Sequence, residues 1–322
     1  MKHILILLLV FFGINAFADT VLLRDGSTPI NCNIVSWSKE GLRISKDANS
    51  SQEVLPWYRI RKVSSEEIGI GLLSHLARGE MLWRAKLRLL RGDIALATPL
   101  FKEVFMHLKN SDGDDAYLAA EGLLRCHLAN GNINESVMPW LSVVDHIQTG
   151  RDSQLQVLSS IIDKNTLLCP HLPPVWDFIN VQKSLKTLQL KSDIAQAFYI
   201  IITSPLEFRD QALLGPLFLQ QLFLSMDGNE IIFPETAKFQ EWQQCWLLFA
   251  EATGLQKNGE EDKAMLQFAK VASMYQTSQP WLAGASMITL LESFDRVGNT
   301  KVADNLIHEI SRVLPYHPLR KE

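Results

Sequence analysis

The sequence has no marked excess of charge of one sign. Among its 322 residues, 31 Lys and Arg stand against 35 Asp and Glu, and the formal net charge is −4. Proteins that coat nucleic acid carry a strong positive charge, so we expect no nucleic-acid partner. Glycine and proline are few, at 17 and 13 residues, which excludes a collagen-like chain, and 47% hydrophobic residues exclude a disordered one. The length allows two or three globular domains.

Long hydrophobic runs are missing beyond the N-terminus. Lys2, the apolar run 4–12 and Ala16-Phe17-Ala18 form the pattern of a secretory signal peptide that is cleaved after Ala18. The run is shorter than the ~20 residues that span a membrane, and no later run is both long and free of charge. We therefore expect residues 1–18 to be removed and the mature protein to be exported, to the periplasm or outside the cell, with no membrane-spanning segment.

Cysteine is scarce, and its four positions lie far apart: Cys32, Cys126, Cys169 and Cys245. Four cysteines in an oxidising compartment allow three pairings, but a long chain with an adequate core does not need them, so a disulfide and free buried thiols both stay open. The sequence has no C-x-x-C pair, and Cys126-His127 and Cys169-x-His171 lack the spacing of zinc ligands. We therefore expect no metal site and no cofactor.

Catalytic motifs are also missing. The sequence contains no G-x-S-x-G, no H-E-x-x-H, no glycine-rich phosphate loop and no paired carboxylates, and its eight histidines are scattered. We therefore expect a non-catalytic protein. A site assembled from distant residues would leave no such pattern, so an enzyme is kept as an alternative.

Residues 19–64 are predicted to form a small β module. Short apolar runs at 21–23, 30–37, 42–44 and 54–63 are separated by turn residues, which indicates a curled or barrel-like β-meander. The turn Arg24-Asp25-Gly26 and the closing pattern Trp57-x-x-Ile60-x-x-Val63 resemble small SH3-like or Sm-like modules at the start of secreted bacterial proteins.

From residue 64 onward the apolar residues follow a helical period. Gly92 and Gly131 lie 39 residues apart, as do Gly259 and Gly298, and each lies between two amphipathic segments. Glycine permits a tight turn between two antiparallel helices. We therefore predict a mainly α fold of helical hairpins.

The predicted helical part has three regions and a tail. Repeat-like hairpins are expected at 65–150 and 236–316. Three prolines within the segment Cys169–Pro174 exclude a helix there, so 151–235 is expected to be an irregular, proline-punctuated helical region. Residues 317–322 form the C-terminal tail.

The residues that follow the four glycines resemble the second helix of the tetratricopeptide repeat. Examples are Ala97, Phe101 and Val104 after Gly92, while Ala264, Phe268 and Val271 occupy the same positions after Gly259. The resemblance covers about half of the chain. It implies an α-solenoid whose groove binds a peptide or protein.

Five residues are candidates for binding a partner. Arg84, Arg88 and Arg91 follow helical i, i+4, i+7 spacing, with Lys86 beside them, and such a stripe can hold an acidic peptide or phosphate. Alternatively, these residues bind no partner and form a solvent-exposed face near the C-terminus of a helix, where positive charge suits the helix dipole. Trp57 is a candidate as one of two tryptophans of the β module that could bind carbohydrate.

The main hypothesis is therefore a secreted or periplasmic, non-catalytic scaffold that binds a peptide or protein partner in a helical-repeat groove. One alternative is an envelope enzyme or a protein that binds cell wall or carbohydrate. Its site would lie where the β module meets the helices, near Trp57 or the segment Cys169–Pro174. Another alternative is a structural envelope component that forms a homo-oligomer.

Overall fold

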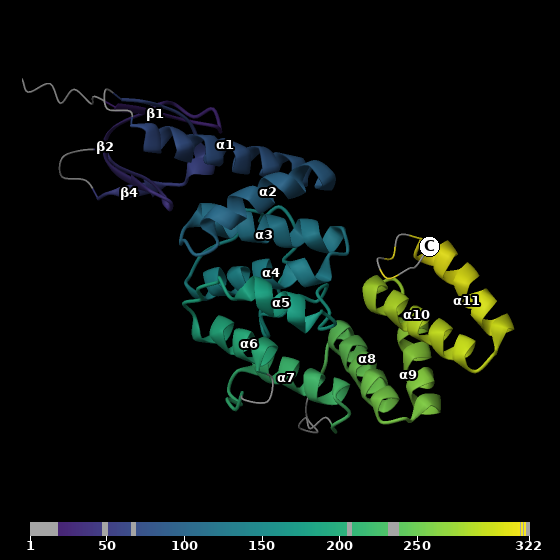
Figure 1. The fold of residues 1–322 in the computed structure, drawn as a ribbon. Helices are drawn as coiled ribbons and strands as arrows, with labels where there is room; N and C mark the ends of the chain where they lie inside the picture. Colours follow the sequence, from purple (N-terminus) through teal and green to yellow (C-terminus); the bar gives the residue numbers. More distant parts are fainter. Residues whose placement is uncertain are drawn as a thin grey trace, which may run out of the picture. The chain divides into compact units, whose positions relative to one another are not determined.

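The computed structural model describes residues 19–46, 51–65, 69–204, 208–230, 238–315, 317 and 319. The predicted signal peptide lies outside the described residues. Five β-strands are followed by eleven α-helices within this part of the chain (Figure 1). This confirms the mainly α fold class, with helical hairpins behind a small β module. None of the described helices is both long and apolar enough to cross a membrane.

The β module is one antiparallel sheet in the strand order β4-β3-β2-β1-β5. Its strands are β1 (Asp19–Leu23), β2 (Ile30–Ser38), β3 (Gly41–Ser45), β4 (Glu53–Leu55) and β5 (Ile60–Ser64). The predicted run 54–63 is divided in two, because Pro56 ends β4 and a 3₁₀ turn, η1 (Trp57–Arg59), precedes β5. The last strand pairs with β1 at the other edge, in the register Val21 to Val63.

The chain divides into two compact units after Trp83, so the first two thirds of helix α1 (Ile70–Leu90) belong to the same unit as the sheet. Alternate residues of the strands, such as Val21, Leu42 and Ile44, form the core of this unit, and Leu72 of α1 is buried among them. The strand period of two gives the sheet one apolar face, and α1 supplies the apolar surface that covers it.

The second unit contains the predicted helical hairpins. Their helices are α2 (Ile94–Leu108), α3 (Asp114–Ala129), α4 (Ile133–Gln148), α8 (Glu241–Lys257), α9 (Glu261–Met274), α10 (Pro280–Arg296) and α11 (Thr300–Val313). All four predicted turn glycines have positive φ, between 70° and 82°. After each glycine, the next amide bonds to the carbonyl five residues back, as in Asp93 N to Arg88 O at 2.9 Å. This is the Schellman arrangement, which requires glycine because L residues rarely adopt that φ.

The central region contains three shorter helices: α5 (Phe178–Leu185), α6 (Asp193–Thr203) and α7 (Leu214–Met226). They pack in sequence order, with α5 and α6 against α4, α7 against α6, and α8 against α7 (Figure 1). The proline-rich segment contains no helix, as predicted. Its Cys169 and Leu172 are buried, so it forms part of the core.

Candidate binding sites

Trp57 is a packing residue of the first unit. Its side chain is 3% exposed, the indole Nε1 donates to the carbonyl of Ser38 at 2.9 Å, and the ring stacks on His75 with 5.0 Å between centroids. Gly79 lies so close to the Trp57 carbonyl that no side chain would fit there. A tryptophan buried in this way has almost no surface for a partner, whereas Trp37, at 41%, is exposed.

Two of the four predicted basic residues, Arg84 and Arg88, lie on one face of α1, and Arg91 is the first residue after the end of this helix. Arg84, Arg88 and Arg91 are exposed or half-buried. Among the described residues, none of their side chains makes a hydrogen bond or an ion pair. Lys86 lies about 200° around the helix from Arg84, so it does not belong to this face, and it has an interaction of its own. We call Arg84, Arg88 and Arg91 the arginine stripe.

The four cysteines are unpaired and buried. Burial raises the pKa of the Cys169 thiol to about 12 and that of Cys245 to about 12, so both are protonated and unreactive at neutral pH. In the part of the chain that the structure describes, no three His, Cys, Asp or Glu side chains gather in a way that could hold a metal ion.

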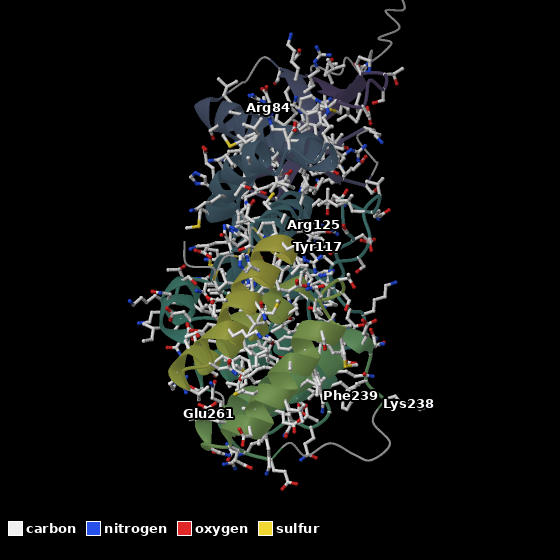
Figure 2. All side chains as sticks on the ribbon, turned by 90° about the vertical axis from the view of Figure 1, so that its right-hand side faces the viewer. Arg84, Tyr117, Arg125, Lys238, Phe239 and Glu261 are labelled. Carbon is white, nitrogen blue, oxygen red and sulfur yellow. The ribbon has the colours of Figure 1, made fainter. Side chains whose placement is uncertain are left out.

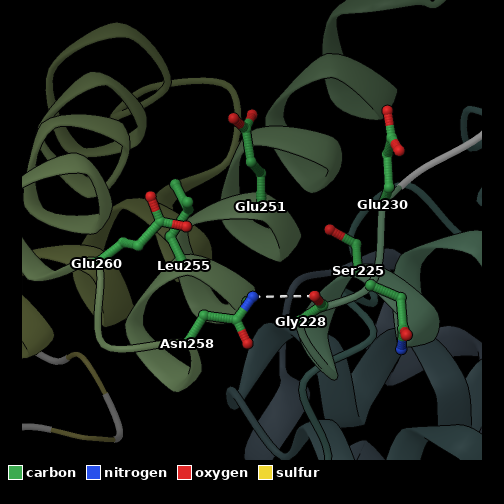
Figure 3. Close-up of a pocket in the computed structure, with 9 residues that line it drawn as sticks. Ser225, Gly228, Glu230, Glu251, Leu255, Asn258 and Glu260 are labelled. Carbon is green, nitrogen blue, oxygen red and sulfur yellow. Dashed lines mark hydrogen bonds between the residues drawn. The ribbon is translucent and has the colours of Figure 1, made fainter.

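An acidic cavity of about 480 Å³ lies between the C-terminal ends of α7 and α8 (Figure 3). Glu230, Glu251 and Glu260 line it, and Figure 3 shows their carboxylates at separate places around it. The loop after α7 is fixed to α8 by the amide of Asn258, which donates to the Gly228 carbonyl at 2.9 Å. The acidic groups are therefore spread over a rim and do not converge on one point.

Two further cavities, of about 510 and 330 Å³, lie on either side of Trp281 at the start of α10. They share four lining residues: Leu128, Ala129, Pro280 and Trp281. The larger is bounded by the α3–α4 turn, by residues 313–315 and by His317. These cavities bring together parts of the chain that are 150 residues apart in sequence.

The smaller of these, which we call the Gln279 cavity, combines apolar and polar walls. Its apolar wall is formed by Leu128, Ile133 and Ile161, and its polar groups are Arg125, His171 and Gln279. His171 belongs to the proline-rich segment that the sequence singled out. Arg125 and Gln279 carry no motif, and only the folding of distant helices toward each other places them together.

Arg125, which is labelled in Figure 2, is held in place by a buried carboxylate of the same helix, α3. Its Nε and Nη2 donate to Oε1 of Glu121, at 3.0 and 2.7 Å, and Nη2 also donates to the Ser159 carbonyl at 2.8 Å. Ser153 donates to the other oxygen of Glu121 at 2.5 Å. Nη1 of Arg125 has no acceptor among the described residues.

Comparisons with protein-family models, with curated proteins and with solved structures find no match to this chain. The functional argument therefore rests on the fold and on the geometry of these sites.

Proposed function

We propose that this protein is an exported, non-catalytic scaffold, and that its arginine stripe binds an acidic segment of a partner protein. The observation that carries the proposal is the lack of any intramolecular partner for Arg84, Arg88 and Arg91 among the described residues. Three like charges with i, i+4, i+7 spacing repel each other, and an acidic partner would relieve that repulsion. The stacked hairpins support a binding role, because arrays of this kind present extended surfaces.

The stripe begins in the last turns of α1 and ends at Arg91, just beyond it, where positive charge also suits the helix dipole. That effect stabilises the helix without neutralising the arginines. Guanidinium groups recognise carboxylates with paired hydrogen bonds, so an acidic peptide segment is the chemistry that fits best.

The test is cross-linking of the tagged, full-length protein inside the cells that make it, followed by quantitative mass spectrometry. We expect the variant R84Q/R88Q/R91Q to recover at least tenfold less of one defined partner than the wild type does. The matched control K102Q/K183Q/K186Q removes the same charge from exposed lysines elsewhere in the second unit and should recover the partner fully. Equal loss in both variants, or recovery of the protein only with copies of itself, would contradict the proposal.

Export has its own test. The N-terminus of the mature protein, purified from the extracytoplasmic fraction, is expected to be Asp19, because the signal-peptide pattern ends at Ala18. A protein that keeps Met1 and stays in the cytoplasm would overturn this part of the proposal, whatever the outcome for the arginine stripe.

A further inference from the structure

The Gln279 cavity is large enough for a small organic ligand. Its volume of about 330 Å³ equals the space of about eleven water molecules at ~30 Å³ each. Its lining combines apolar side chains with a few polar groups, which is the usual composition of a small-molecule site. No Asp or Glu of the described residues lines it.

Gln279 is the most informative of the polar groups. Its residue is only 5% exposed, yet its side chain makes no hydrogen bond with any described residue and does not cap the helix that it precedes. Both backbone groups of Gln279 are hydrogen-bonded, since the N–H donates to the carbonyl of Tyr275 and the carbonyl accepts from the N–H of Ala283. Its side-chain amide atoms are not among the fully buried atoms without a partner, so water in the cavity can reach them, and a ligand would take the place of that water.

Gln279 is also the N-cap of α10, a helix of 17 residues. Pro280 has no N–H, and the amides of the next two positions, Trp281 and Leu282, have no capping side chain. This end of the helix carries the positive pole of the dipole. The uncapped end and the unpartnered carboxamide therefore lie at the same cavity wall.

Arg125 and His171 add further donors. Nη1 of Arg125 has no acceptor among the described residues. The guanidinium is fixed by its hydrogen bonds to Glu121, so it cannot move toward another group without breaking that pair. Glu121 balances the charge of Arg125. The attraction for an anion therefore comes from the N-terminal end of α10 and from the neutral hydrogen-bond donors that line the cavity. His171 is exposed, and its side chain makes no hydrogen bond within the described part of the chain.

We propose that the Gln279 cavity binds an apolar carboxylate. The carboxylate accepts hydrogen bonds from the Gln279 amide, the N-terminal amides of α10 and Nη1 of Arg125, while the apolar part lies against Leu128, Ile133 and Ile161. A free aliphatic acid and the C-terminal residue of a peptide share this chemistry. The site is separate from the arginine stripe and does not depend on the scaffold function.

The first experiment measures binding of four probes to the purified full-length protein by ligand-observed NMR: hexanoate, hexanamide, acetate and N-acetyl-leucine. We expect hexanoate or N-acetyl-leucine to bind at least tenfold more tightly than hexanamide, which lacks the charge, and than acetate, which lacks the apolar group. The tighter of the two acids shows whether a free acid or a chain terminus is preferred. Equal binding of hexanoate and hexanamide, or binding of none of the probes, overturns the proposal.

The second experiment locates the site. Ala129→Glu adds a carboxylate at an exposed position that lines the cavity, and it should weaken binding of the acid at least tenfold. Ala95→Glu is the matched control, because Ala95 is exposed on α2 and does not line the cavity, and it should bind like the wild type.

Gln279→Leu keeps the volume and removes the amide. It should weaken binding of the acid about threefold to tenfold, because it removes one of the hydrogen bonds that the carboxylate accepts. Acid binding that survives both Ala129→Glu and Gln279→Leu, in variants that melt like the wild type, places the ligand elsewhere and refutes this site.

Discussion

Gly284 of α10 lies directly beneath the imidazole of His317, so close that even a methyl group at Gly284 would overlap the ring. His317 is buried there. Its Nε2–H donates to the Trp281 carbonyl at 2.9 Å, and its Nδ1 accepts from the amide of Leu319 at 3.3 Å. A neutral imidazole satisfies both bonds, and burial lowers the pKa of His317. The start of the predicted C-terminal tail is thus attached to α10.

Replacing Gly284 with alanine should detach this segment. The added methyl group overlaps His317, and overpacking of this kind costs about 1–3 kcal/mol. We expect faster hydrogen exchange in the peptide that covers 314–319, with little change in the β module. Gly71→Ala is the control, because its nearest neighbour would be at an ordinary 3.6 Å, and it should leave exchange unchanged. Unchanged exchange in Gly284→Ala would show that His317 is not held against α10.

Acid should destabilise the second unit through His146. This side chain is buried against Tyr117, with 5.6 Å between ring centroids, and its Nδ1 has no partner in the described part of the chain. Burial lowers the pKa of His146 to about 4, which outweighs the opposite effect of Asp145 and Asp112. The unfolded chain, with an ordinary pKa near 6.5, then binds the proton more readily than the folded one.

The stabilisation is therefore complete above pH 6.5 and is lost as the pH falls toward 4, by about 3 kcal/mol at most. Thermal unfolding of the wild type between pH 7 and 4 should show this slope, and His146→Phe should flatten it. His107→Gln, at an exposed position of α2, is the control and should keep the wild-type slope. A slope that persists in His146→Phe would assign it to other groups, such as His317 or His127.

The thiols should be unreactive in the folded protein. All four are buried, and burial raises the pKa of Cys126 to about 11 and those of Cys169 and Cys245 to about 12. We expect no reaction with a thiol reagent under native conditions and four reactive thiols in denaturant. A mass that is lower by two hydrogens without reductant would reveal a disulfide and contradict the structure.

The pair Glu121 and Arg125 should couple strongly. Glu121→Gln leaves the guanidinium without its buried counter-charge, so we expect a loss of about 3–5 kcal/mol in unfolding free energy. Arg125→Met should cost a similar amount, because it leaves the buried carboxylate of Glu121 without its counter-charge. The double variant E121Q/R125M should be less destabilised than the sum of the two single changes, as measured by denaturant unfolding. Simple additivity would mean that the pair contributes no specific interaction.

Local patterns predicted the fold well where a single residue type controls the backbone. The glycines at 92, 131, 259 and 298 ended helices as expected because the positive φ of a Schellman turn favours glycine, and the same turn recurs at Gly150 and Gly228. The helices α6 and α7 lie in the region 151–235, for which irregular helical structure was predicted. The short helix α5 was not singled out, because it follows the proline-rich segment closely and its eight residues are too few to distinguish a helix by their pattern.

The sites were less predictable, because burial and long-range approach leave little trace in the sequence. Trp57 looks like a surface aromatic in sequence, yet its indole hydrogen bond and the close approach of Gly79 place it inside the unit. Gln279 belongs to no motif, and it forms a site only together with Arg125, which lies 154 residues earlier in the sequence. The arginine stripe could be predicted from the sequence, since helical spacing alone brings Arg84, Arg88 and Arg91 to one side.

Each helix of the second unit packs mainly against its neighbours in sequence. Most contacts therefore join residues that are made within a short time of one another, and closing each one requires only a short loop. A chain that emerges from its N-terminus can then complete one hairpin after another without waiting for the last residue. The two cavities beside Trp281 differ from these local contacts, because they join residues 125–133 to residues 279–281, and the larger one also needs Val313 and His317. Ligand binding in the Gln279 cavity therefore requires that α3 and the start of α10 have both been made and have come together.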